Sequence, residues 1–187
     1  MTATASVCQW VCKMGDTEKN KKEKEPDKTV RVYLDNCAYN RPYDSQTQMK
    51  VELETQAKLR IQRLIKEGKI ELASSYMSLY ECGENPDPDK AEAITDFIET
   101  NSVAHAGENR IDEIEDDAKP IMDTGVKFKD ACHVAAAIYT GADYFISTDQ
   151  RLLKYQTNAI KLINPVEFFF NEEEATESAD KEEEDDS

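Results

Sequence analysis

The sequence has no long hydrophobic run, and it contains only two histidines, His105 and His133, among its 187 residues. A membrane-spanning helix needs about 20 consecutive apolar residues, so we expect no membrane span and no membrane partner. The first residues also lack a basic segment followed by a long apolar stretch, which argues against a secretory signal. These absences favour a cytoplasmic protein.

Closely spaced cysteines are missing as well. The five cysteines are scattered along the chain, and none of them forms a CxxC pair: Cys8, Cys12, Cys37, Cys82 and Cys132. Zinc sites are usually built from cysteine and histidine ligands at close spacing. The pattern therefore argues against zinc and indicates reduced thiols, as is typical of cytosolic proteins.

The chain also lacks an excess of positive charge. It has 39 acidic and 23 basic residues and a net charge of −16. Residues 29–170 alone carry 24 acids and 16 bases, which gives a net charge of −8. This balance excludes a protein that holds nucleic acid by bulk positive charge. Any phosphate-binding role must depend on local basic side chains or on bound cations.

Both ends of the chain have the composition of disordered segments. Residues 1–28 end in a mixed-charge stretch without apolar periodicity, and residues 171–187 carry ten acids and one base, a net charge of −9. Such segments bury too little apolar surface to offset the entropy lost on ordering. We therefore expect a disordered leader over residues 1–28, one domain over residues 29–170, and a disordered acidic tail over residues 171–187.

Strand-like and helix-like patterns alternate within the central segment. Apolar residues at helical spacing predict helices over residues 49–65 and 128–140, which Gly68 and Gly141 would end. Asp89 is expected to cap a third helix. Strands are predicted over residues 30–34, 69–73, 102–106, 143–147 and 160–163. Strands separated by helices predict an α/β fold with a parallel sheet.

Four acidic residues fall where the elements of such a sheet end or begin. Asp35 and Asp149 follow predicted strands, Glu81 lies on a predicted helix, and Asp130 lies in the first turn of another. Ligands of open parallel sheets bind at the carboxyl ends of the strands. Converging carboxylates repel one another, and Mg²⁺ or Mn²⁺ would relieve that repulsion. The alternative interpretation is that these acids are helix caps and surface charges.

Four sequence blocks resemble, in order, the motif blocks of PIN-domain ribonucleases, a family that includes the VapC-type toxins of bacterial toxin–antitoxin pairs. The blocks are VRVYLDNCAYNRPYD, SSYMSLYE, KDACHVAAAIYTGADYFISTDQRLL and INPVEFF. No single block is specific, but the four in this order are. The resemblance covers about residues 30–170 and implies a three-layer α/β/α sandwich around a parallel central sheet.

The resemblance also assigns roles to individual residues. It implies that Asp35, Glu81, Asp130 and Asp149 are both the catalytic residues and the metal ligands. Ser75 and Ser147 take supporting positions, with Ser147 standing where the family usually has threonine, and Asn36 either orients the cluster or caps a turn. Five basic residues flank the blocks and are candidates for binding the RNA backbone, although ordinary surface charge is the more common role for any one of them: Arg41, Lys127, Lys129, Arg151 and Lys154. His133 and four aromatic residues are expected in the core: Tyr33, Phe128, Tyr144 and Phe168.

The function implied is a metal-dependent endoribonuclease, the toxin of a type II toxin–antitoxin pair. One or two Mg²⁺ or Mn²⁺ ions would lower the pKa of a bound water and polarise the scissile phosphate. The expected partners are an RNA substrate, a small antitoxin protein and a second copy of the chain. The alternatives are an RNA-processing nuclease without an antitoxin and an inactive PIN-like scaffold for protein interaction. A receiver domain and a haloacid-dehalogenase-type phosphatase are disfavoured, because Asp35 is followed by Asn36 and Cys37 and not by a further acid.

Overall fold

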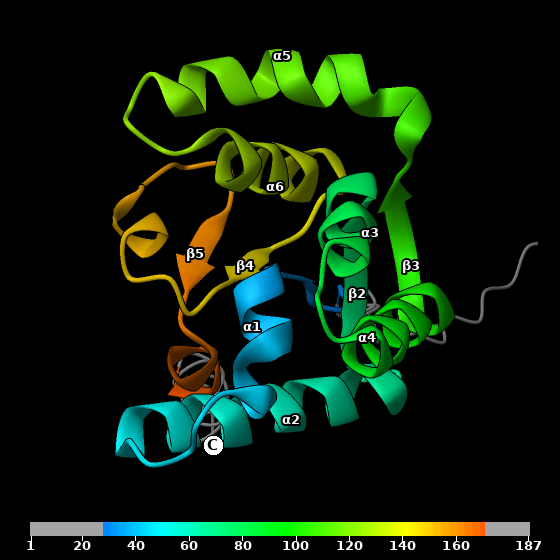
Figure 1. The fold of residues 1–187 in the computed structure, drawn as a ribbon. Helices are drawn as coiled ribbons and strands as arrows, with labels where there is room; N and C mark the ends of the chain where they lie inside the picture. Colours follow the sequence, from blue (N-terminus) through cyan, green and yellow to red (C-terminus); the bar gives the residue numbers. More distant parts are fainter. Residues whose placement is uncertain (1–27, 171–187) are drawn as a thin grey trace, which may run out of the picture.

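A five-stranded parallel sheet forms the centre of the structure, a computed structural model that describes residues 28–170 (Figure 1). Its strands are β1 (Arg31–Leu34), β2 (Glu71–Ser75), β3 (Ser102–Ala106), β4 (Tyr144–Ile146) and β5 (Lys161–Ile163). The spatial order is β3-β2-β1-β4-β5, and every pairing is parallel. The chain therefore builds outward from β1 in one direction and then in the other, which makes the β1–β4 boundary the place where the strand order reverses.

Helices cover both faces of this sheet. They are α1 (Asn36–Asn40), α2 (Met49–Lys66), α3 (Tyr76–Gly83), α4 (Pro88–Asn101), α5 (Ile111–Met122) and α6 (Phe128–Tyr139). Short 3₁₀ turns are η1 (Arg41–Tyr43), η2 (Glu108–Arg110) and η3 (Leu152–Lys154), and residues 165–170 are helical. In Figure 1, α5 and α6 lie on one side of the strands and α2 lies on the other.

The strand residues alternate between two hydrophobic clusters. Val32 and Leu34 of β1 pack with α2, α4 and residues 165–170, whereas Tyr33 packs with α5 and α6. This is the period-2 alternation of a strand buried on both faces. The three-layer α/β/α sandwich with a parallel central sheet that the sequence predicts is confirmed.

Glycines end two of the predicted helices. Gly68 and Gly141 both have φ of +68° just beyond α2 and α6, a conformation that glycine adopts without steric cost. The predicted cap of α4 was wrong: Asp87, not Asp89, accepts a hydrogen bond from the Lys90 N–H at 3.3 Å. Pro88 explains the difference, because proline suits the first helical position and makes the residue before it the cap.

Other differences are local. The second strand begins at Glu71 and not at residue 69. Tyr33 and Phe168 are fully buried as predicted, but Phe128 opens α6 and is 43% exposed. The expectations for residues 1–27 and 171–187 lie outside the described residues. Within residues 28–170, no helix is both long enough and apolar enough to cross a membrane.

Candidate active site

Asp35 lies at the carboxyl end of β1 and is fixed by several hydrogen bonds. Its backbone N–H donates to the Ile146 carbonyl at 2.9 Å, which extends the β1–β4 pairing by one residue. Its carboxylate caps α1 by accepting from the Asn36 N–H at 2.7 Å, and it also accepts from Ser147 Oγ at 2.8 Å and from the Cys37 thiol at 2.9 Å. The side chain is 5% exposed. The carboxylate is therefore held in one orientation at the point where the strand order reverses.

Glu81 reaches the same place from α3. Its Oε2 lies 3.1 Å from His133 Nε2, and its Oε1 lies 3.9 Å from Lys129 Nζ. Partial burial raises the pKa of Glu81, but a hydrogen bond and charge from His133, the charge of Lys129 and a hydrogen bond from Asn36 outweigh burial, so the pKa ends below its usual value. Glu81 is thus kept ionised near neutral pH.

His133 is buried as predicted, with 1% exposure, but it belongs to a chain of polar groups. The Tyr33 hydroxyl lies 2.8 Å from His133 Nδ1, 2.6 Å from Ser75 Oγ and 2.9 Å from Ser78 Oγ. A tyrosine hydroxyl donates one hydrogen bond, and ionised Glu81 can only accept. In the neutral form of His133, the proton therefore lies on Nε2, which donates to Glu81, and Nδ1 accepts from Tyr33.

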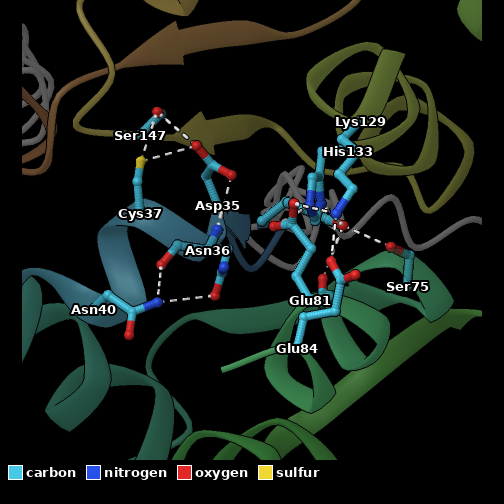
Figure 2. Close-up of polar contacts among 12 residues, drawn as sticks. Asp35, Asn36, Cys37, Asn40, Ser75, Glu81, Glu84, Lys129, His133 and Ser147 are labelled. Carbon is cyan, nitrogen blue, oxygen red and sulfur yellow. Dashed lines mark hydrogen bonds and ion pairs between the residues drawn. The ribbon is translucent and has the colours of Figure 1, made fainter. Parts of the chain in front are cut away.

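Asp35, Glu81 and His133 converge on one point (Figure 2). One ligand atom of each, two carboxylate oxygens and one imidazole nitrogen, lies within 4.8 Å of the others. Such a donor set fits a divalent cation, because carboxylates suit Mg²⁺ and Mn²⁺ and imidazole suits transition metals. Among the described residues, two of the four predicted acids belong to this compact group.

The other two acids, Asp130 and Asp149, line a neighbouring cavity of about 440 Å³. Burial and the charges of Asp35 and Asp149 raise the pKa of Asp130, and His133 and Lys127 oppose the shift. Asp130 therefore lies within electrostatic reach of Asp35 as well as Asp149. We call Asp35, Glu81 and His133 the compact group, and Asp130 with Asp149 the open pair.

The predicted supporting residues differ in how directly they contact the acids. Ser147 contacts both the compact group and the open pair, since its Oγ donates to Asp35 and accepts from the Asp149 N–H at 3.0 Å. Asn36 uses its side-chain oxygen to accept from Asn40 Nδ2 at 3.0 Å, which leaves its amide N–H groups for Glu81. Ser75 contacts none of the four acids directly and acts only through Tyr33.

The five basic candidates fall into two sets. Lys127, Arg151 and Lys154 line the cavity beside the open pair. Arg41 instead pairs with Asp44 at 2.9 Å and with Glu54 at 3.0 Å, and Lys129 pairs with Glu84. The first set supplies local positive charge next to Asp130 and Asp149. In the second set, Arg41 pairs with carboxylates away from the site, and Lys129 pairs with Glu84 while it also lies beside Glu81.

Sequence reasoning missed the polar contacts of His133, Tyr33 and Cys37. One signal was present for His133: it follows Asp130 by three residues on a helix, so the two side chains share one face. The Cys37 thiol, which donates to Asp35, had no signal beyond its nearness in sequence. Burial and the charge of Asp35 raise the pKa of Cys37 to about 12, so this thiol stays protonated.

Comparisons with known proteins found likenesses among solved structures only. No protein-family model matches the chain, and no curated protein matches it. Among solved structures, it is similar to a chain of VapBC2 from Rickettsia felis bound to a DNA fragment from their promoter. The TM-score is 0.44 and the sequence identity is 12%, and the match covers 72% of this chain and 98% of that chain.

Proposed function

We propose that the protein is a metal-dependent endoribonuclease that hydrolyses RNA phosphodiester bonds, with Asp35, Glu81, Asp130 and Asp149 as its acidic residues. The observation that carries this proposal is the compact group at the reversal of strand order, next to a cavity that contains both acids and bases. Perturbed pKa values of clustered groups in a cleft are typical of functional sites.

The chain's own donor set favours Mn²⁺ over Mg²⁺ in this proposal. A bound divalent ion supplies an activated water and polarises a phosphate oxygen. The compact group would hold it through Asp35, Glu81 and the Nε2 lone pair of His133. The imidazole proton must then sit on Nδ1, where the Tyr33 hydroxyl, 2.8 Å away, accepts it. Nitrogen donors suit Mn²⁺ better than Mg²⁺.

The cavity fits the substrate side of the same reaction. An RNA phosphate approaching Asp130 and Asp149 meets like charge, which Lys127, Arg151 and Lys154 on the cavity wall offset locally. These three residues supply the local basic side chains on which phosphate binding by an acidic chain depends. The sequence resemblance extends the proposal to the toxin of a type II pair, with a small antitoxin protein and a second copy of the chain as partners.

Cleavage of a mixed RNA substrate in Mg²⁺, Mn²⁺ or EDTA tests the proposal. We expect cleavage only with a divalent ion, and Asp35→Asn should lower the rate by about 10³-fold, or ~4 kcal/mol of barrier. Asp116→Asn is the matched control, because Asp116 is an α5 acid with a 71% exposed side chain. Cleavage in EDTA, or an unimpaired Asp35→Asn enzyme, would rule out the acid cluster as the catalytic site. Absence of cleavage with either metal would favour a scaffold.

A further inference from the structure

Among residues 28–170, Lys58 on α2 is a largely buried cation without a counter-ion. It is 3% exposed, and it forms no hydrogen bond or ion pair within residues 28–170. Lysine is almost never buried to this extent unless it is paired. The Lys58 ammonium group keeps its solvent contact while the rest of the side chain is covered. The contact that it does make is a cation–π contact, with Nζ 5.8 Å from the centroid of the Tyr39 ring.

The carboxylate one helical turn before Lys58 has other partners. Glu54 lies 3.0 Å from Arg41 Nε and 3.7 Å from Lys50 Nζ, and it accepts from Asn164 Nδ2 at 2.7 Å. Glu54 is thus paired with other cations and not with Lys58, although its Oε2 accepts no hydrogen bond within the described residues.

Lys58 lines a pocket of about 280 Å³ between η1, α2 and α4. Its apolar walls include Tyr43, Ile94 and Phe97, and its polar groups are Lys58, Lys66 and Gln62, with no carboxylate in the lining. Lys66 Nζ lies 5.7 Å from the centroid of the Phe97 ring. Burial and the charge of Lys66 lower the pKa of Lys58 to about 8, so Lys58 is still mostly protonated at pH 7. Two ammonium groups thus share one pocket.

We propose that this pocket binds a phosphate monoester that carries a small apolar or aromatic body. Two lysines match the double negative charge of a phosphate monoester better than the single charge of a carboxylate, and Gln62 offers an amide donor. The volume lies near the lower end of small-molecule pockets, which limits the ligand to about the size of a mononucleotide. The pocket shares no lining residue with the cavity of the open pair.

Calorimetric titration with AMP, inorganic phosphate, adenosine and acetate tests this site. EDTA is present throughout, so that neither metal binding nor RNA cleavage contributes to the result. AMP and phosphate should bind, AMP more tightly, and adenosine and acetate at least tenfold more weakly than AMP. A short RNA with a 5′-phosphate, compared with the same RNA without it, shows whether a terminal nucleotide also enters. Absence of AMP binding at about 10 mM, or equal binding of adenosine, would overturn the proposal.

Substitutions of the pocket lysines test whether AMP binds in this pocket. Lys58→Met keeps the length of the side chain and removes the buried charge, so it should weaken AMP at least tenfold while the melting temperature stays equal or rises. Lys66→Gln, at an exposed position, should also weaken AMP and gives a second test that does not endanger the fold. Arg63→Gln is the control, because it makes the same change of charge on α2 outside the pocket. AMP binding that is unchanged in Lys58→Met and Lys66→Gln would overturn the proposal, whatever the outcome of the cleavage assay.

Discussion

The compact group and the open pair hold their carboxylates in opposite ways. The Asp35 carboxylate accepts one hydrogen bond from a backbone N–H and two from side chains, and Glu81 accepts one from His133, so both charges are compensated by fixed donors. Asp130 instead has its pKa raised by burial and by its acidic neighbours. The difference indicates that the carboxylates of the compact group are already fixed and compensated, whereas the open pair keeps a repulsion that a bound cation would relieve.

The largest expected difference between the compact group and the open pair is the loss of Mn²⁺ affinity when an acid of each is substituted. Asp35→Asn should weaken Mn²⁺ binding by about 100-fold or more, because it removes a charge from the compact group. Asp149→Asn should weaken Mn²⁺ binding less than about tenfold, because Asp149 lies outside that group. Electron paramagnetic resonance titration of Mn²⁺ measures both affinities. Equal losses of Mn²⁺ affinity in the two variants would mean that the compact group and the open pair form one ligand set.

Tyr33→Phe should have the next largest effect. It removes the hydroxyl that contacts His133 Nδ1, and losing such an outer partner typically costs about 10-fold in metal affinity. Ser75 and Ser78 also lose a buried partner, which should lower the free energy of unfolding by about 1–3 kcal/mol. Urea unfolding with and without Mn²⁺ separates the two effects. If Mn²⁺ stabilises Tyr33→Phe as much as the unmodified protein, the hydroxyl does not position His133 for a metal.

Basic residues without a carboxylate partner should contribute more to RNA binding than basic residues that are already paired. Lys154→Gln should reduce the slope of log affinity against log salt for single-stranded RNA by about 0.7, the value expected for one lost phosphate contact. Lys129→Gln should change that slope by less than half as much, because Lys129 pairs with Glu84. Fluorescence anisotropy in Ca²⁺ at several salt concentrations gives both slopes. A larger effect at Lys129 would place the RNA over α3 and not over the cavity.

The smallest expected effect concerns the stability of the metal-free protein. The pKa of Asp130 is higher in the folded state than in the unfolded chain, so its ionisation opposes folding. That cost is absent below the unfolded pKa, grows as the pH rises, and is complete above the folded pKa. Asp130→Asn should therefore raise the melting temperature at pH 7 by no more than about 3 °C, since Asp130 is partly exposed, and should leave it unchanged near pH 3. A Tm that falls at pH 7 would contradict this.

The sequence predicted the order of elements well because the governing signals are local. Apolar spacing, Gly68 and Gly141 determined α2 and α6, and the β-branched and aromatic runs marked the strands. Phe128 shows the limit of this reasoning. An aromatic residue at a helix start is equally compatible with core and surface, and only the position of α6 against its neighbours decides between them.

The sequence indicates which acids to consider for the candidate site, but it does not indicate how they group in space. Asp35 and Asp149 follow strands and Asp130 lies in the first turn of α6, which the sequence reveals, and their placement at one edge follows from a parallel sheet. Glu81 lies near the end of α3 instead. That His133 joins Asp35 and Glu81, while Asp130 and Asp149 line a separate cavity, depends on the rotation of α3 and α6. Packing on the sheet sets this rotation, which sequence spacing alone does not determine.

The bond between Ser147 and Asp35 has a consequence for the synthesis of the protein. It joins residues 112 positions apart, and β1 lacks one neighbour until β4 has been made. Ribosomes synthesise the chain from its amino end, so a nascent chain that stops before residue 144 contains Asp35, Glu81 and His133 without the strand that completes their support. A nuclease built this way would gain its activity only when synthesis is nearly complete, and truncated translation products would be harmless to the RNA around them.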